Sequence, residues 1–424
     1  MVHSVGSEVR RIGSEGEFLS ERAIERFIED CLGSERLDGR SLCVLVPDAT
    51  RSCPLPPLLA ALHRAVGQRV TRLTILVALG THRPMTDPEL SAHLAGGASL
   101  GETFPRATVT NHEWWRPEQL TTVGSIAAAR VRELSGGLID QEVPVEINRA
   151  VIDHDVTLIV GPVLPHEVVG YSGGNKYLFP GVSGRQVVDV THWLGALLTS
   201  AEMIGRPGTT PVRALIDEAA GCLPGRRLAL CLVTGRAGGL HSMSFGTPEE
   251  AWASAVDTSS RVHVTYLERP VQRVLSILPE RYDDMWTGAK GFYKVEPVVA
   301  DGGQVVIYAP HISQLSVTHP DIASIGYHCR DYFLYNWDSY KGHHWGDLAH
   351  STHLKGAGTY DPRTGEHSRV TVTLATSVPE AVVRAANLDY LDPATVDVHG
   401  WTDRPDTLVV RDAGEHLFRL GGAA

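Results

Sequence analysis

Short apolar runs rich in β-branched residues alternate along the chain with segments of helical periodicity. The runs lie at Leu42–Val46, Leu73–Ala78, Val156–Val160, Leu228–Val233, Val262–Leu267, Val274–Leu278 and Val305–Ala309. The helical segments are Ala23–Leu32, Pro56–Val66, Asp87–Leu94, Arg185–Thr199 and Pro211–Ala220. Buried strands that alternate with helices predict an α/β protein with largely parallel sheets. We expect two α/β domains, with a cleft between them that would hold an active site.

A domain boundary is predicted near Glu268–Pro270, where one strand ends and a new strand–helix–strand series begins. The chain has 424 residues, which is long enough for more than one domain. We therefore expect an N-terminal, cofactor-binding α/β domain over residues 1–268 and a C-terminal α/β domain over 269–401. The pattern of Thr407–Leu420 predicts a strand and a hairpin, so residues 402–424 are expected to pack back on the first domain.

The composition excludes several classes of protein. Acidic residues outnumber basic ones by 49 to 38, and the net charge of -11 argues against a non-specific nucleic-acid binder. The six cysteines include no C-x-x-C pair, which favours a reduced intracellular protein over a disulfide scaffold or a thiolate zinc site. The apolar runs are far shorter than the roughly 20 residues of a membrane span. We expect a cytoplasmic protein that binds neither nucleic acid nor a membrane.

Polar side chains follow each of the first three predicted strands. Asp48, Thr50 and Arg51 follow the first strand, His82 follows the second, and His166 follows the third. Ligands bind outside the carboxyl ends of strands in open parallel sheets, so these residues are predicted to meet at a functional edge. The alternative for any one of them is a loop residue or, for Asp48 or Thr50, a helix cap.

A glycine-rich loop over residues 170–184 precedes a predicted helix. Its segment Ser172-Gly173-Gly174-Asn175-Lys176 resembles a cradle in which backbone N–H groups face an anion. The loop matches neither the Walker A pattern nor G-x-G-x-x-G, so a structural turn is the open alternative. His192 lies in the helix that follows, where it is either a satisfied core residue or a metal ligand.

The segment 332–353 is rich in aromatic residues and histidines. It contains Tyr332, Phe333, Tyr335, Trp337, Tyr340, His343, His344, Trp345, His350 and His353. This composition suggests part of a ligand pocket, and the alternative is a surface loop packed on the cleft. His350 and His353 have the spacing of a metal pair, but no third ligand is evident.

Taken together, these motifs resemble the nickel-pincer nucleotide-dependent lactate racemase family, whose members racemise or epimerise 2-hydroxy acids. The resemblance rests on Asp48-Ala49-Thr50-Arg51-Ser52-Cys53-Pro54, on Gly80-Thr81-His82-Arg83-Pro84, on His166 with the Ser172–Lys176 loop and Pro180-Gly181, and on His192. A weaker match is Asp284-Met285-Trp286-Thr287-Gly288-Ala289-Lys290. The similarity extends from about residue 40 to about residue 310.

The resemblance implies a cofactor and a set of roles. The cofactor is a nickel-pincer nucleotide (pyridinium-3-thioamide-5-thiocarboxylic acid mononucleotide with nickel), tethered to Lys176, with His192 as the remaining nickel ligand. The residues that would contact this cofactor are Asp48, Thr50, Arg51, Ser172, Gly173 and Gly174. His82 and His166 would be the catalytic acid–base pair, and Arg51, Lys290 and Thr287 would bind the substrate. Cofactor-synthesis proteins would be partners of the chain.

The expected reaction is physically reasonable for such a site. The Cα–H of a 2-hydroxy acid is not activated for deprotonation, whereas removal of a hydride leaves a planar 2-keto acid that can accept it back on either face. The hydroxyl proton must leave at the same time, and imidazole suits this because it titrates near neutrality. Two histidines would serve one enantiomer each. A soft, sulfur-rich donor set completed by one imidazole suits nickel.

The sequence departs from the family pattern at two positions of these motifs. Thr287 stands where many relatives carry glutamine, and Asn175 replaces a basic residue before the tethering lysine. The change at Thr287 could alter the substrate, and the aromatic and histidine-rich segment 332–353 suggests a pocket for a larger, polar or aromatic 2-hydroxy acid. We therefore expect a substrate other than plain lactate. Two alternatives remain open, namely an enzyme of the same cofactor that performs net redox chemistry or another isomerisation, and a phosphate- or nucleotide-binding homologue without metal chemistry.

Overall fold

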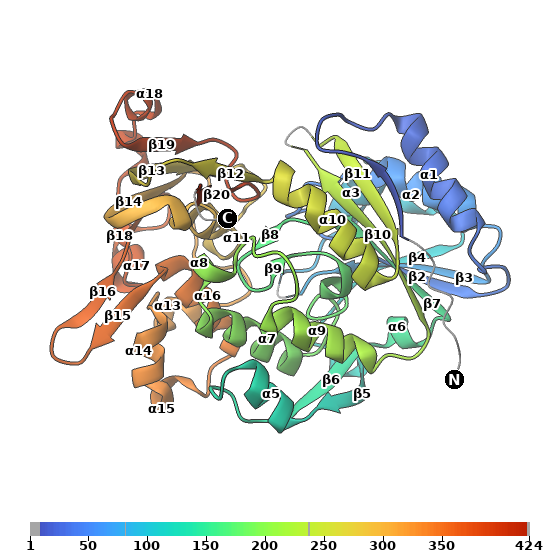
Figure 1. Cartoon of the computed structure of the whole chain (residues 1–424), viewed down its shortest axis with the longest axis horizontal. Helices are drawn as coiled ribbons and strands as arrows, with labels where there is room; N and C mark the ends of the chain where they lie inside the picture. The colour runs from blue at the N-terminus through green and yellow to red at the C-terminus, as the bar shows by residue number, and fades with distance from the viewer. Residues whose placement is uncertain (1–8, 81, 236–237, 422–424) are drawn as a thin grey trace.

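The structure is a computed structural model that describes residues 9–80, 82–235 and 238–421. Over these residues the chain forms two main sheets flanked by helices (Figure 1). The strands of the seven-stranded sheet are, in spatial order, β1 (Arg10–Gly13), β11 (Leu240–Gly246), β10 (Arg226–Thr234), β7 (Val156–Pro162), β2 (Ser41–Pro47), β3 (Arg72–Ala78) and β4 (Ala107–Asn111). The five strands from β10 to β4 are parallel, whereas β11 and β1 continue the sheet antiparallel.

The order of these strands reverses beside β2. The chain passes from β2 to β3 and β4 in one direction and then returns to place β7 and β10 on the other side of β2. The switch point therefore lies between β2 and β7. Ligands bind at the carboxyl ends of strands beside such a point.

Strand β2 is buried on both faces, which explains its uninterrupted apolar sequence. Leu42, Val44 and Val46 pack into one core cluster, together with residues of α1 (Glu21–Gly33) and α2 (Leu55–Val66). Cys43 and Leu45 point to the opposite face and join a second cluster. This alternation is the period of two that a pleated strand imposes.

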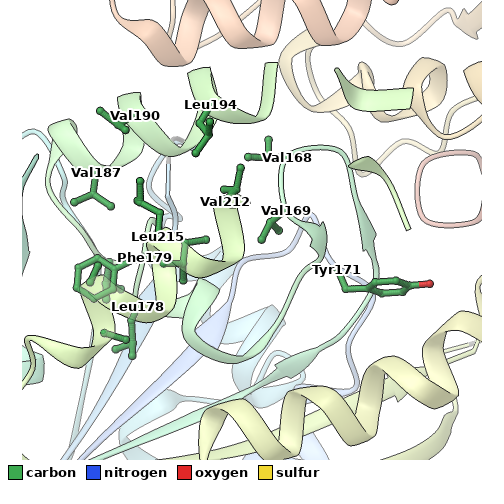
Figure 2. Close-up of a cluster of buried hydrophobic side chains, with 14 of the residues drawn as sticks. Val168, Val169, Tyr171, Leu178, Phe179, Val187, Val190, Leu194, Val212 and Leu215 are labelled. Atoms are coloured by element: carbon green, nitrogen blue, oxygen red, sulfur yellow. The ribbon is translucent and has the colours of Figure 1, made fainter. Parts of the chain in front are cut away.

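The second cluster supports the glycine-rich loop (Figure 2). Helices α7 (Arg185–Leu197) and α9 (Pro211–Gly221) contribute its apolar side chains from one side, and the loop contributes its own from the other. The labelled members are Val168, Val169, Tyr171, Leu178, Phe179, Val187, Val190, Leu194, Val212 and Leu215. Residues 187, 190 and 194 follow helical spacing, so one face of α7 is committed to this core.

The second main sheet has five strands within the described residues, and all of its pairings are parallel. In spatial order they are β18 (Asp389–Tyr390), β17 (Thr371–Thr376), β14 (Val299–Ala309), β13 (Val271–Ile277) and β19 (Thr407–Val410). The mixed α/β architecture with largely parallel sheets agrees with the prediction. The division of the chain at residues 268 and 269 stays a prediction.

The hairpin predicted over Thr407–Leu420 is wrong. Strand β19 is an edge strand that pairs in parallel with β13, while β20 (Leu417–Leu420) pairs in parallel with β12 (Val264–Leu267). Part of the segment 402–424 therefore belongs to the second sheet, and only β20 reaches back to the strand before residue 268. Both partners are distant in sequence, so the local pattern could not distinguish this pairing from a hairpin.

The remaining elements are short or cover the sheets. The other helices are α3 (Asp87–Ala95), α4 (Leu100–Thr103), α5 (Ala128–Leu134), α6 (Arg149–Ile152), α8 (Ser200–Met203), α10 (Pro248–Val262), α11 (Met285–Gly288), α12 (Lys290–Tyr293), α13 (Ile322–Ile325), α14 (Arg330–Tyr335), α15 (Trp337–Tyr340), α16 (Trp345–Lys355), α17 (Glu380–Ala385) and α18 (Val398–Thr402). Two-stranded pairs are β5 (Leu120–Ile126) with β6 (Val143–Asn148), β8 (Pro165–His166) with β9 (Gly170–Tyr171), and β15 (Gly358–Asp361) with β16 (Gly365–Ser368). None of the described helices has the length and apolar character needed to cross a membrane.

Candidate active site

A cavity opens at the carboxyl ends of β2, β3 and β7. Nine residues predicted for the site line it, namely Asp48, Arg51, His82, His166, Ser172, Gly173, Lys176, His192 and Lys290. The part of the chain beyond residue 268 adds Trp286, Tyr293, Gly346, His350 and His353 to the walls. The three strand ends therefore converge as the parallel sheet requires, although the individual roles stay predictions.

Three predicted residues do not line this cavity. Thr50 and Thr287 line a neighbouring cavity, which shares Asp48 and His82 with the first. The hydroxyl of Thr50 donates to Asp48 Oδ1 at 2.7 Å. The backbone N–H and hydroxyl of Thr287 donate to Asp284 Oδ1 at 2.9 and 3.0 Å.

Gly174 is a buried residue of the loop itself and does not line the cavity. Thr81 of the histidine motif lies outside the described residues.

Asp48 and His82 form a short pair at the cavity wall. Asp48 Oδ2 lies 2.5 Å from His82 Nδ1, and Asp48 Oδ1 also accepts the Thr50 backbone N–H at 3.1 Å. Burial alone would raise the pKa of Asp48, but the neighbouring His82 and the Thr50 hydrogen bond hold that pKa well below its usual range. Because a carboxylate only accepts, the proton of the shared bond belongs to His82 Nδ1. His82 Nε2 then has a lone pair to act as a base.

His166 has the opposite arrangement. Its Nδ1 accepts the backbone N–H of Val168 at 3.2 Å, so a neutral ring carries its proton on Nε2. Burial, followed by the positive charges of Lys176 and Arg51, lowers the pKa of His166 well below its usual value. Glu167 Oε2 lies 3.2 Å from the same Nδ1 and could accept a proton from it if the ring became charged. Sequence reasoning missed Glu167, although it follows His166 directly.

His192 projects from α7 on the side away from the core formed by that helix. Its Nδ1 donates to the carbonyl of Val188 at 2.7 Å, which leaves the lone pair on Nε2. Burial and then Lys176 lower the pKa of His192, so the ring is neutral. A neutral imidazole whose other nitrogen donates to a backbone carbonyl is the usual form of a histidine metal ligand.

Lys176 lies in a short 3-10 helix over residues 174–177. Burial, together with the positive charge of Arg51, lowers the pKa of Lys176 to about 7. The neutral, nucleophilic form of its amine is therefore accessible near neutral pH.

The glycine-rich loop approaches its neighbours too closely for larger residues. Gly173 and Gly174 have φ angles of +88° and +57°. A Cβ atom on Gly173 would lie 2.5 Å from the side chain of Val163, and one on Gly174 would lie 2.9 Å from Trp252 Cβ. These positions require glycine for both conformation and space.

Arg213 holds this loop in place, although no local sequence pattern indicates this role. Its guanidinium donates to the carbonyls of Gly173 at 3.1 Å and Tyr171 at 2.6 Å. The same group lies 4.2 Å from the ring centroid of Trp252. Asn175 adds hydrogen bonds of 2.9 Å to Asp217 and 2.6 Å to Glu249. The loop is therefore a rigid platform for Lys176.

Lys290 faces the cavity from α12 with only 4 % of its surface exposed. Its Nζ lies 4.9 Å from the ring centroid of Tyr282 and has no hydrogen-bond partner among the described residues. Burial, followed by the positive charge of Arg51, lowers the pKa of Lys290 to about 8. Lys290 and Arg51 are thus cations that could bind a carboxylate.

Protein side chains alone do not form a metal site in the described part of the chain. No group of three or more His, Cys, Asp or Glu residues there could hold a metal ion. The reading of His350 and His353 as a metal pair therefore lacks a third protein ligand.

Fold and site together define an α/β protein with imidazole, lysine and arginine side chains gathered at the carboxyl edge of a parallel sheet. Residues 17–205 match the model of the lactate racemase N-terminal domain. Over these residues the chain is similar to the lactate racemase family.

Two curated lactate racemases match part of the chain. The protein from Thermoanaerobacterium thermosaccharolyticum is 26% identical over 41% of this chain, and the one from Lactiplantibacillus plantarum is 25% identical over 45%. These matches span 38% and 41% of the relatives' own lengths.

Solved structures match nearly the whole chain. A protein from Thermotoga maritima has a TM-score of 0.88 and 32% identity, covering 96% of this chain and 100% of that one. The lactate racemase apoprotein from Thermoanaerobacterium thermosaccharolyticum has a TM-score of 0.69 and 17% identity, covering 93% of each chain. The second likeness shows a shared fold.

Proposed function

We propose that the chain is a racemase or epimerase of a 2-hydroxy acid other than plain lactate. The observation that carries this proposal is the convergence of His82, His166, Lys176 and His192 on one cavity. The two acid–base candidates come from separate strand ends, whereas the tether and metal-ligand candidates come from the loop and helix that follow.

The residues present fit a nickel-pincer nucleotide. Lys176 offers a partly neutral amine for the covalent tether, and His192 offers an unshared Nε2 lone pair for nickel. Backbone groups of Ser172 and Gly173 lie at the same wall, where a larger residue at 173 would not fit. When bound, this cofactor would supply the hydride acceptor, and the protein would supply orientation and proton transfer.

His82 and His166 would handle the hydroxyl proton. His82 is prepared to receive a proton at Nε2, because Asp48 holds the ring through Nδ1. The imidazolium that forms would be stabilised by the same carboxylate. His166 would serve the other enantiomer as the second acid–base group, returning a proton from its imidazolium form, which Glu167 Oε2 at 3.2 Å from Nδ1 would stabilise.

Arg51 and Lys290 would hold the substrate carboxylate. Both line the cavity, and the Lys290 ammonium has no hydrogen-bond partner among the residues that the structure describes. Fixing the carboxylate would place the C2 hydroxyl near the histidines and the Cα–H toward the cofactor. A cytoplasmic location and an interaction with cofactor-synthesis proteins belong to the same proposal.

Two measurements test the function. Protein produced together with a cofactor-synthesis system should show a mass adduct on Lys176 and one nickel per chain. Lys176→Ala should lose the adduct, and His192→Ala should lose nickel. Single enantiomers of a panel of 2-hydroxy acids should then lose optical purity with the loaded protein. Accumulation of a keto acid with optical purity retained would contradict the racemase and favour net redox chemistry. A chain that acquires neither adduct nor nickel would instead be a nucleotide- or phosphate-binding homologue.

A further inference from the structure

Helix α16 brings two buried imidazoles to the cavity. The proposed proton transfer uses neither of them. His350 and His353 are three residues apart, so they lie on one face of the helix. Both line the cavity, with exposed fractions of 8 % and 4 %. The Nε2 atom of each ring has no hydrogen-bond partner within the described residues.

Neighbouring side chains hold both rings in place. His350 stacks on Trp286 with ring centroids 4.0 Å apart and an interplanar angle of 26°. His353 Nδ1 is hydrogen bonded to the hydroxyl of Ser200 on α8. These contacts fix the two rings, so their unpartnered nitrogens cannot readily turn toward another protein group.

Burial favours the neutral form of both rings. It is the main cause that lowers the pKa of His350 well below its usual value, and the neighbouring His353 and His319 oppose its protonation further. Burial lowers the pKa of His353 to about 4, although the nearby carboxylate of Glu167 opposes this shift. The other titratable groups that face His350 are Lys290 and His192, and His192 also faces His353.

An apolar substrate tail would leave these nitrogens without partners, and each buried unsatisfied polar group costs about 1–3 kcal/mol. A hydroxyl group both donates and accepts, so it can pair with a neutral imidazole in either tautomer. A second carboxylate only accepts, and it would bring a negative charge toward Glu167, whose pKa stays low beside His353, Lys294 and Arg51 despite its burial.

We infer that His350 and His353 form a subsite for hydroxyl groups, so that the substrate is a 2-hydroxy acid whose carbon chain bears further hydroxyls beyond C2. This inference rests on the proposed function, because the cavity must also hold the C2 hydroxyl and the carboxylate. Trp286 and Tyr293 supply the apolar surface against which the carbon chain would lie.

Three acids of equal chain length test the subsite on cofactor-loaded protein. They are 2-hydroxybutanoate, 2-hydroxybutanedioate and 2,3,4-trihydroxybutanoate, and the dissociation constant of each is measured by titration calorimetry. Satisfying one or two buried nitrogens should make the trihydroxy acid bind at least about tenfold more tightly than 2-hydroxybutanoate. Equal or weaker binding of the trihydroxy acid would overturn the inference, and tightest binding of the dicarboxylate would assign the subsite to a carboxylate instead.

Two variants test whether His350 and His353 cause the preference for the trihydroxy acid. His350→Phe keeps a ring to stack on Trp286, and His353→Phe keeps the ring volume. Each should reduce the trihydroxy acid's advantage severalfold while binding of 2-hydroxybutanoate changes little. An advantage that survives in both correctly folded variants would contradict the assignment. Should either variant fail to fold, the comparison of the three acids on the unmodified protein still decides.

Stereochemistry at C2 is followed in the same samples by chiral chromatography. A preference for the trihydroxy acid without epimerisation of any acid would overturn the proposed function and leave the subsite standing. Epimerisation of 2-hydroxybutanoate without that preference would do the reverse.

Discussion

Asp48 Oδ2 lies 2.5 Å from His82 Nδ1 and fixes the tautomer that leaves a lone pair on Nε2. The Nδ1 of His166 instead accepts the N–H of Val168, and Glu167 Oε2 lies 3.2 Å from the same nitrogen. The two histidines are therefore chemically different before any substrate binds. A reaction that converts one enantiomer into the other needs one group to take a proton and another to return it. His82 is in the tautomer that can take a proton, and His166 can return one once its ring is protonated.

Replacing Asp48 by Asn should remove the support for His82 as a base. An amide can donate to Nδ1 and would then favour the tautomer with its proton on Nε2. We expect kcat for racemisation to fall by about 10²–10⁴-fold, the range typical of a lost acid–base group or a wrong tautomer. Thr50→Val is the matched control, because it removes one hydrogen bond to Asp48 but keeps the carboxylate. Wild-type kcat in Asp48→Asn would contradict the role assigned to the pair.

The amine of Lys176 should react near neutral pH. Its pKa of about 7 is lowered by burial and then by Arg51, so the ammonium form dominates below pH 7 and the nucleophilic amine dominates above it. The rate of acetylation in cofactor-free protein should rise about tenfold from pH 6 to pH 8 and then level off. Peptide mass spectrometry can follow Lys176 separately from the exposed Lys341, which serves as the surface reference. A Lys176 rate that keeps rising tenfold per pH unit to pH 9 would contradict the lowered pKa.

Gly174→Ala should destabilise the fold. The residue has φ = +57°, and a Cβ would lie 2.9 Å from Trp252 Cβ and 3.0 Å from the carbonyl oxygen of Pro248. Strain and the close contact together should lower the free energy of unfolding by about 1–3 kcal/mol, measured by urea denaturation. Gly33→Ala is the control, because Gly33 ends α1 with nothing within 4 Å of the added Cβ. Equal stability of the two variants would contradict this prediction, because it would show that the loop can shift to accommodate the added Cβ.

Much of the site could be predicted from the sequence, because several site residues directly follow predicted strands. Asp48, His82 and His166 each follow a largely apolar run, and parallel strands bring such positions to one edge of a sheet. Two other residues predicted for the site do not line the main cavity. The Thr50 hydroxyl is hydrogen bonded to Asp48, and the Thr287 hydroxyl is hydrogen bonded to Asp284.

Other parts of the site depend on packing between distant segments. Glu167 lies beside a predicted catalytic residue, but only the fold places its carboxylate near His353 and Arg51. Ser200 meets His353 across 153 positions of sequence. Strand β19 joins β13 rather than a local partner, for the same reason. Composition and periodicity describe local patterns, so they could not predict these contacts.

Lys should not be able to replace the contacts that Arg213 makes with the loop, even though Lys keeps the positive charge. The guanidinium donates to two loop carbonyls, Gly173 and Tyr171, while its face lies over Trp252. An ammonium lacks the planar fork needed to make these contacts together, and it is more strongly hydrated, so its burial is less favourable.

We expect Arg213→Lys to lower the free energy of unfolding by about 1–3 kcal/mol, because buried carbonyls lose their donors. The loop that holds Lys176 should also lose order, so less of the protein should acquire the Lys176 adduct when the cofactor-synthesis system is present. Arg384→Lys is the control, because Arg384 forms an exposed ion pair with Glu380 and its replacement should change stability by less than about 0.5 kcal/mol. An Arg213→Lys protein with unchanged stability and a full adduct would show that the loop keeps its shape without the paired hydrogen bonds.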